Sequence, residues 1–155
     1  MVSKRIVVCL FLMAAFSELC LAQSTQRAAS PKSQRIKIYF YHEPGEYIDL
    51  SPVTRVIRSN SPARAAIEGL LAGPTAAERQ RGFDGLSGAG EFAIGKLTIK
   101  GGTARINFVS SRTWAGFPGD IAPARFKKAV ELTLKQFANV KRVIVSVDGD
   151  LNFET

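Results

Sequence analysis

Apolar residues recur every three or four positions between residues 123 and 137, the spacing that places side chains on one face of a helix. The stripe consists of Phe126, Ala129, Val130, Thr133, Leu134 and Phe137. Pro123 fits the first turn of such a helix, and Asp120 or Ala122 flanks it as a candidate cap. Burying each large apolar side chain contributes about 1.5–3 kcal/mol, which exceeds the ~0.7 kcal/mol range of ordinary helix propensities. Burial of the apolar face therefore contributes more to the stability of this helix than helix propensity does.

A second helical pattern begins at Ser61, a favoured cap residue that precedes a proline. Its apolar stripe is formed by Ala63, Ala66, Ile67, Leu70 and Leu71. Gly73 and the proline that follows it predict the end of the helix. Thr75 and Glu78 have the three-residue spacing of a capping box, which predicts one further helical turn.

Alternating apolar and polar positions predict strands in the rest of the chain. Ile36, Ile38 and Phe40 indicate a strand that is buried on one side. The extended segment 47–57 contains Pro52, which predicts an edge position or an irregularity.

Two more strands, around residues 97–99 and 104–108, flank a Gly-Gly pair that is typical of a tight hairpin turn. The segment 140–147 is apolar on nearly both faces, which predicts a strand inside a sheet, either central among its neighbours or covered on each side. Residues 80–90 contain four glycines and are expected to form a mobile connection. The resulting β-α-β-β-α-β order predicts an α+β fold, a two-layer sandwich in which two helices cover one mixed or antiparallel sheet.

Residues 1–22 have the layout of a secretory signal peptide. A basic pair precedes an apolar run at 6–16, and small residues lead to a predicted cleavage after Ala22. The run is shorter than the ~20 residues needed to span a bilayer. Leu19 next to Cys20 disfavours lipidation of that cysteine. We therefore expect secretion across the cytoplasmic membrane, to the periplasm or the cell exterior.

The remaining chain divides into a polar tether at 23–34 and one domain at 35–152. Hydrophobic residues make up 46% of the sequence, which excludes wholesale disorder. Cys9 and Cys20 both lie in the predicted signal, so the exported product has no thiol for a disulfide or a metal. The formal net charge of +8 is typical either of a solubilising surface or of a domain with anionic partners, and export argues against nucleic acid as such a partner.

No set of residues has the spacing of a catalytic or metal site. His42 is the only histidine of the chain, so it has no imidazole partner. The glycine-rich middle lacks the lysine of a phosphate loop. Glu91, Asp120 and Asp148 are candidate carboxylates for a hydrolase, but nothing in the sequence brings them together. We therefore expect a non-catalytic domain with no metal, no cofactor and no small-molecule substrate.

Across residues 35–152, sequence motifs resemble those of the GerMN domain of bacterial sporulation and spore-germination proteins. The most specific matches are PVTR at 52–55, LLAGPT at 70–75, and FANV at 137–140 with VDG at 147–149. Asn-Phe-Val-Ser at 107–110 stands where the family often has an Asp-Phe-Ser-like run. The resemblance implies an extracytoplasmic, non-catalytic module that mediates assembly or ligand binding.

We therefore expect an envelope domain that binds itself or other envelope proteins. Trp114 and Phe117, in a glycine-rich loop, are either exposed anchors for a partner or a cover for the core. The segment 47–56 is a candidate edge for strand addition. The alternative function is binding of an anionic envelope polymer, of the cell wall or of lipid headgroups, through Arg55, Arg58, Arg64, Lys127, Lys128, Lys141 and Arg142.

Overall fold

The structure of the chain, a computed structural model, describes residues 32–42 and 49–153. The predicted signal peptide at 1–22 and nearly all of the predicted tether, up to residue 31, lie outside the described residues. In the part of the chain that is described, no helix is long and apolar enough to cross a membrane.

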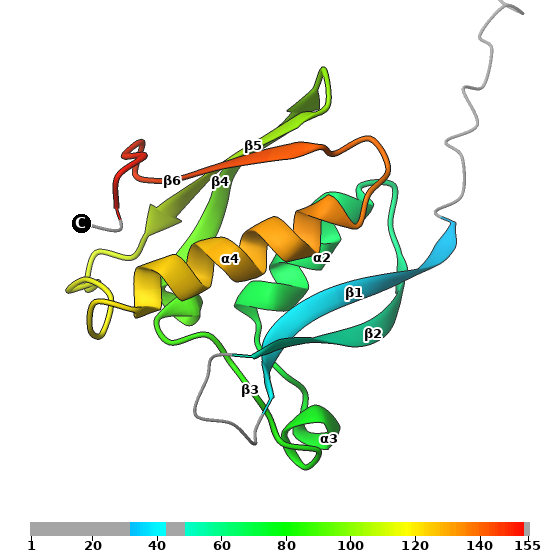
Figure 1. Ribbon diagram of the computed structural model, residues 1–155, viewed down its shortest axis with the longest axis horizontal. Coiled ribbons are helices and arrows are strands. Elements are labelled where there is room, and N and C mark those ends of the chain that lie inside the picture. Colours follow the sequence, from blue (N-terminus) through cyan, green and yellow to red (C-terminus); the bar gives the residue numbers. More distant parts are fainter. Residues whose placement is uncertain (1–31, 43–48, 154–155) are drawn as a thin grey trace, which may run out of the picture. The chain divides into compact units, whose positions relative to one another are not determined.

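Two three-stranded sheets form the β part of the fold (Figure 1). The first has the order β2-β1-β3 and contains β1 (Ser33–His42), β2 (Leu50–Arg58) and the short β3 (Phe83–Asp84). β1 runs antiparallel to both neighbours, and its alternating pattern buries Ile36 and Ile38 as predicted. β2 lies at the edge of this sheet, where a proline within a strand is tolerated.

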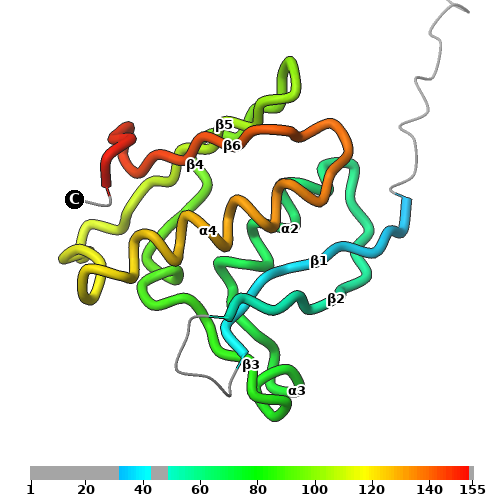
Figure 2. Tube along the Cα trace, in the orientation of Figure 1, coloured from blue at the N-terminus to red at the C-terminus, as the bar shows by residue number. Residues whose placement is uncertain are grey.

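The second sheet has the order β4-β5-β6 and contains β4 (Phe92–Lys100), β5 (Thr103–Ser110) and β6 (Arg142–Val147). The Gly-Gly turn between β4 and β5 has positive φ at both residues, which confirms the predicted hairpin. β6 runs parallel to β5, and Figure 2 traces the two side by side. The expectation that β6 lies inside a sheet is wrong. It is an edge strand that buries Val145 and Val147 on one face and leaves the other face half-exposed.

Two main helices, α2 (Pro62–Leu71) and α4 (Ala122–Lys135), lie between these sheets (Figure 1). α2 contacts β1, β2 and β4, whereas α4 contacts β1 and β6. A four-residue helix, α3 (Ala76–Arg79), and a 3₁₀ turn, η1 (Ala89–Glu91), complete the elements of the described chain. The α+β class is confirmed. Its β-part is divided into two sheets on opposite sides of the helices, where we expected one continuous sheet.

Thr133 of α4 and Gln136, the residue that follows α4, explain why β1 does not continue into the second sheet. The Gln136 carboxamide accepts a hydrogen bond from the Lys37 N–H and donates one to the Lys37 carbonyl, both at 2.6 Å. The Tyr39 N–H donates to the Thr133 hydroxyl at 3.4 Å. These backbone groups of β1 would otherwise be available to another strand. The helix therefore occupies the edge of β1 that β3 leaves uncovered.

Both predicted helical stripes face the core. The fully or nearly fully buried members are Ala63, Ala66, Ile67, Leu70, Phe126, Ala129, Val130, Thr133 and Leu134. Gly69 brings α2 close to β1, because a Cβ at this position would lie 2.6 Å from Cδ1 of Ile38. Leu71 is the half-buried last residue of α2, and Phe137 is half-buried just after the end of α4.

Local details of the helix ends differ from the sequence prediction in two places. Ser61 is the residue before α2, but its side chain makes no capping hydrogen bond. Ile121 caps α4 in place of Asp120 or Ala122. The capping box of Thr75 and Glu78 is confirmed at the start of α3.

The glycine-rich segment 80–90 is part of the packed structure and not the mobile connection that we expected. It contributes β3 to the first sheet and most of η1 to the helical layer. Leu86 and Ala89 are buried in the core. The burial of these two apolar side chains thus fixes a segment whose glycine content predicts backbone mobility.

Replacing Leu70 by alanine should lower the free energy of unfolding by about 2–5 kcal/mol, because the side chain is fully buried on α2. Urea denaturation followed by circular dichroism measures the loss. Leu151→Ala is the matched control, since Leu151 is 56% exposed and its truncation should change stability by less than about 0.5 kcal/mol. Equal losses in the two variants would contradict the assigned core face.

Candidate functional site

Trp114 and Phe117 lie in the loop between β5 and α4 and pack onto the core. The Trp114 ring is 5.1 Å from the Phe92 ring and 5.5 Å from the Phe117 ring, measured between centroids. Phe117 also contacts Phe92 at 5.4 Å and Phe126 at 5.6 Å. Of the two roles considered from the sequence, these contacts match the cover for the core, although both side chains remain half-exposed.

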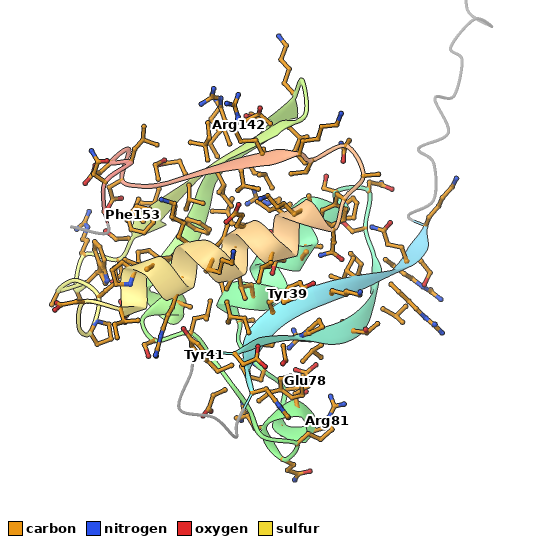
Figure 3. All side chains as sticks on the ribbon, viewed as in Figure 1. Tyr39, Tyr41, Glu78, Arg81, Arg142 and Phe153 are labelled. Carbon is orange, nitrogen blue, oxygen red and sulfur yellow. The ribbon has the colours of Figure 1, made fainter. Side chains whose placement is uncertain are left out.

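The outer side of this aromatic cluster lines an open groove of about 510 Å³. Its walls combine aromatic rings and carboxylates from the loop, the start of α4 and the turn after β6. These residues are Trp114, Phe117, Asp120, Asp148, Asp150 and Phe153. Figure 3 shows Phe153 next to the loop that precedes α4, and its ring is 5.9 Å from that of Phe117.

Asp148 is fixed in the groove wall by the end of β5. Its carboxylate accepts hydrogen bonds from the Ser110 N–H at 3.1 Å and from the Ser110 hydroxyl at 2.6 Å. The side-chain Oδ1 of Asn107 accepts hydrogen bonds from the Ser146 hydroxyl and from the Gly149 N–H. The stretches 107–110 and 147–149, both part of the family resemblance, thus meet and hold the turn after β6.

The groove gathers two of the three carboxylates considered for a hydrolase. Asp120 and Asp148 line it, whereas Glu91 accepts a hydrogen bond from the Ser111 hydroxyl and does not line the groove. Within residues 32–42 and 49–153, no three His, Cys, Asp or Glu side chains are placed to hold a metal ion. His42 bonds to the Arg81 carbonyl at 3.1 Å and packs on Phe83.

Arg55, one of the predicted contact residues, has its guanidinium engaged within the fold. It forms an ion pair with Glu78 at 2.5 Å, and Nε donates to the same carboxylate at 3.0 Å. Nη1 and Nη2 donate to the carbonyls of Gly69 and Gly73, at the end of α2. The Glu78 carboxylate also accepts from the Thr75 N–H at 2.7 Å. These bonds favour a structural role for Arg55.

The hydrogen bonds from Arg55 and Thr75 hold the pKa of Glu78 well below its usual range, at about 2, against the opposing effect of burial. The stretches 52–55 and 70–75 meet at this network, so both serve the packing of β2 against α2 and α3. The sequence assigned Glu78 to a helix cap only. Its second partner is 23 residues away and left no local signal.

The other predicted basic contacts do not form one cluster. Arg58 is the exposed last residue of β2 and pairs in register with Ser33. Lys128 is exposed on α4 and lines a hollow together with Leu50, at the opposite end of β2. Lys127 is half-buried beside it on the helix.

A basic face lies where the outer side of β1 meets α4, and of its cations only Lys128 is a contact predicted from the sequence. Its cations line two adjacent hollows that share Leu132, and they are Arg35, Lys37, Arg125, Lys128 and Lys135. The Arg125 guanidinium lies over the Tyr41 ring at 5.2 Å, and burial raises the pKa of the Tyr41 hydroxyl. Figure 3 places Tyr39 and Tyr41 on the side of β1 toward α4. Asp49 is the acidic residue that lines these hollows.

The fold and the groove together define a small α+β domain with two helices between two sheets. Residues 37–152 match the family model described as "Germane: Sporulation and spore germination", and the chain belongs to this family. No curated protein matches it.

Two solved structures from Bacillus subtilis share the fold. One holds the tandem GerMN domains of the sporulation protein GerM, with 22% identity and a TM-score of 0.58 over 76% of this chain. The other holds the first GerMN domain of GerM, with 23% identity and a TM-score of 0.57 over 75% of this chain. The match covers 40% of the tandem-domain chain and 84% of the single-domain chain. These identities support a shared fold, and the expected resemblance to GerMN domains is confirmed.

The Arg55–Glu78 pair predicts a specific loss of stability in acid. The pKa of Glu78 is lowered in the folded protein, so its contribution is complete above the unfolded value near 4.5 and is lost as the pH falls toward about 2. Glu78→Gln should remove on the order of 2 kcal/mol at pH 7 and flatten the pH dependence of the urea midpoint between pH 4.5 and 2. Glu131→Gln, which breaks an exposed pair on α4, should change stability by less than about 1 kcal/mol. An unchanged acid slope in Glu78→Gln would contradict the pKa assignment.

Proposed function

We propose that this chain is an exported, non-catalytic interaction domain of the bacterial cell envelope, which associates with itself or with envelope proteins. Three observations support the proposal. The first 22 residues have the layout of a secretory signal, the chain belongs to the Germane family, and the first sheet has an open edge at β2. GerM is a sporulation protein, and a role of the same kind is part of the proposal for this chain.

The outer edge of β2 is the observation that carries this proposal. In the order β2-β1-β3, β2 has a described neighbour on one side only. Val56 projects from this strand and is 65% exposed, more than any other large apolar residue of the described chain. An edge with free backbone groups and an apolar side chain can add a strand from a partner. Addition of a partner strand would pair the backbone groups of β2 and bury Val56 in the same step.

A second candidate function, binding of an anionic envelope polymer, is favoured by the basic face. Five cations and one carboxylate line its two hollows, and three of those cations are lysines: Lys37, Lys128 and Lys135, of which Lys135 is paired with Glu131. Because β1 and α4 are both well packed, the cations project from a fixed scaffold. A repeating anion such as a phosphate-bearing wall polymer or a headgroup surface has complementary charge.

Self-association through β2 should appear as a weight-average mass that rises with protein concentration in analytical ultracentrifugation. Val56→Lys places a charge on the open edge and should weaken the association about tenfold, equivalent to about 1.4 kcal/mol. Val109→Lys is the matched control, because Val109 is 45% exposed on β5, whose two sides are already paired. A strict monomer at all concentrations would reject self-association and leave only envelope proteins as partners.

Binding to inorganic polyphosphate tests the second function. The affinity should fall steeply as NaCl rises, because salt screens exposed charges over about 8 Å at physiological ionic strength. Replacing Lys37, Lys128 and Lys135 together by glutamine should weaken binding about tenfold. The control variant carries the same three-charge loss at Lys96, Lys100 and Lys141, exposed residues in or next to the second sheet, and should lose less than about twofold. Salt-insensitive binding, or equal losses in both variants, would reject a site on this face.

A further inference from the structure

The groove beside the Trp114 loop combines aromatic walls with negative charge. Three of its lining residues are aromatic and three are carboxylates, and no lysine or arginine of the described chain lines it. This is unusual for a protein with a formal net charge of +8. The charge of the groove is therefore opposite in sign to the net charge of the chain.

The aromatic walls are held at fixed angles. The planes of Trp114 and Phe117 are 88° apart, with centroids 5.5 Å from each other, so the two rings form a corner. Both pack against Phe92, which is 7% exposed and supports them from the core. Phe153 extends the wall, 5.9 Å from Phe117. Rings supported in this way have little freedom to rearrange.

The negative charge lines the same groove as these rings. Asp148 is anchored by two hydrogen bonds from Ser110, and Asp150 accepts a hydrogen bond from the Asn152 N–H at 2.8 Å. Asp120 lies just before α4 and is exposed. The volume of about 510 Å³ is in the range of small-ligand sites, roughly 300–1,000 Å³.

We propose that this groove binds an organic cation that carries an alkylammonium group. The faces of aromatic rings attract a cation through their quadrupole, and recognition of quaternary ammonium groups by several rings is the established use of this attraction. The three carboxylates repel an anionic ligand and add attraction for a cationic one. A neutral sugar could stack on the rings, but it would leave the negative charge of the site without a partner. The proposal goes beyond the interaction role of β2, which involves a different sheet.

Trp114 provides a direct readout, because it is the only tryptophan of the chain. Titration of the folded protein with choline chloride should give a saturable change in its fluorescence, with an equal concentration of NaCl as the ionic-strength reference. N-acetylglucosamine serves as the neutral probe and should give no saturable change. Chemical-shift changes at the groove in a ¹H–¹⁵N spectrum locate the bound choline.

Two variants of equal charge change test the role of the carboxylates. Asp120→Asn should weaken choline binding about threefold to fivefold, since it removes one charge of the groove. Asp84→Asn removes an exposed charge on β3, outside the groove, and should leave the affinity unchanged. Phe153→Ala should weaken binding by a similar factor with the charge intact.

The proposal is overturned if choline acts no differently from NaCl, if the sugar saturates and choline does not, or if Asp84→Asn weakens binding as much as Asp120→Asn. None of these outcomes bears on self-association, because Val56 and β2 are unchanged in every variant. Conversely, a monomeric protein that binds choline would reject self-association through β2 and support the groove.

Discussion

The Arg55 guanidinium connects three segments that are separate in the sequence. Arg55 projects from β2, and its guanidinium forms an ion pair with Glu78 of α3. It also donates hydrogen bonds to the carbonyls of Gly69, in α2, and Gly73, just after α2. Its side chain is 20% exposed and that of Glu78 is 7% exposed, so both charges are largely withdrawn from water. Loss of either partner would leave the other as an unpaired, poorly solvated charge, which is far more destabilising than loss of a surface pair. The position of β2, and with it the open edge of the sheet, depends on this network.

Features set by neighbouring residues could be predicted from the sequence. The stripes that contain Leu70 and Phe126, the capping box at Thr75 and the glycine hairpin all depend on spacing within a few positions, and each is present. The division into two sheets depends on Gln136, whose amide reaches a strand 99 residues away. The periodicity of apolar residues carries no information about such a contact, so the sequence alone predicts one sheet.

The candidate site was predictable in part for the same reason. Trp114 and Phe117 stood out as aromatic residues in a glycine-rich loop, and the structure brings them to the groove. Asp150 and Phe153 gave no signal, because their role arises only when the chain after β6 returns to the loop before α4. The sequence predicts Arg55 as a partner contact and Glu78 as part of a helix cap, and no local pattern links these two residues.

The Gln136 amide also limits how the first sheet can grow. It occupies backbone groups on the side of β1 away from β2, where an incoming strand would have to pair. A sheet with one side closed by a helix and the other open extends in a single direction. Two copies that meet edge to edge at β2 would use up both open sides, so assembly through this sheet ends at a symmetric pair and does not propagate into a fibre.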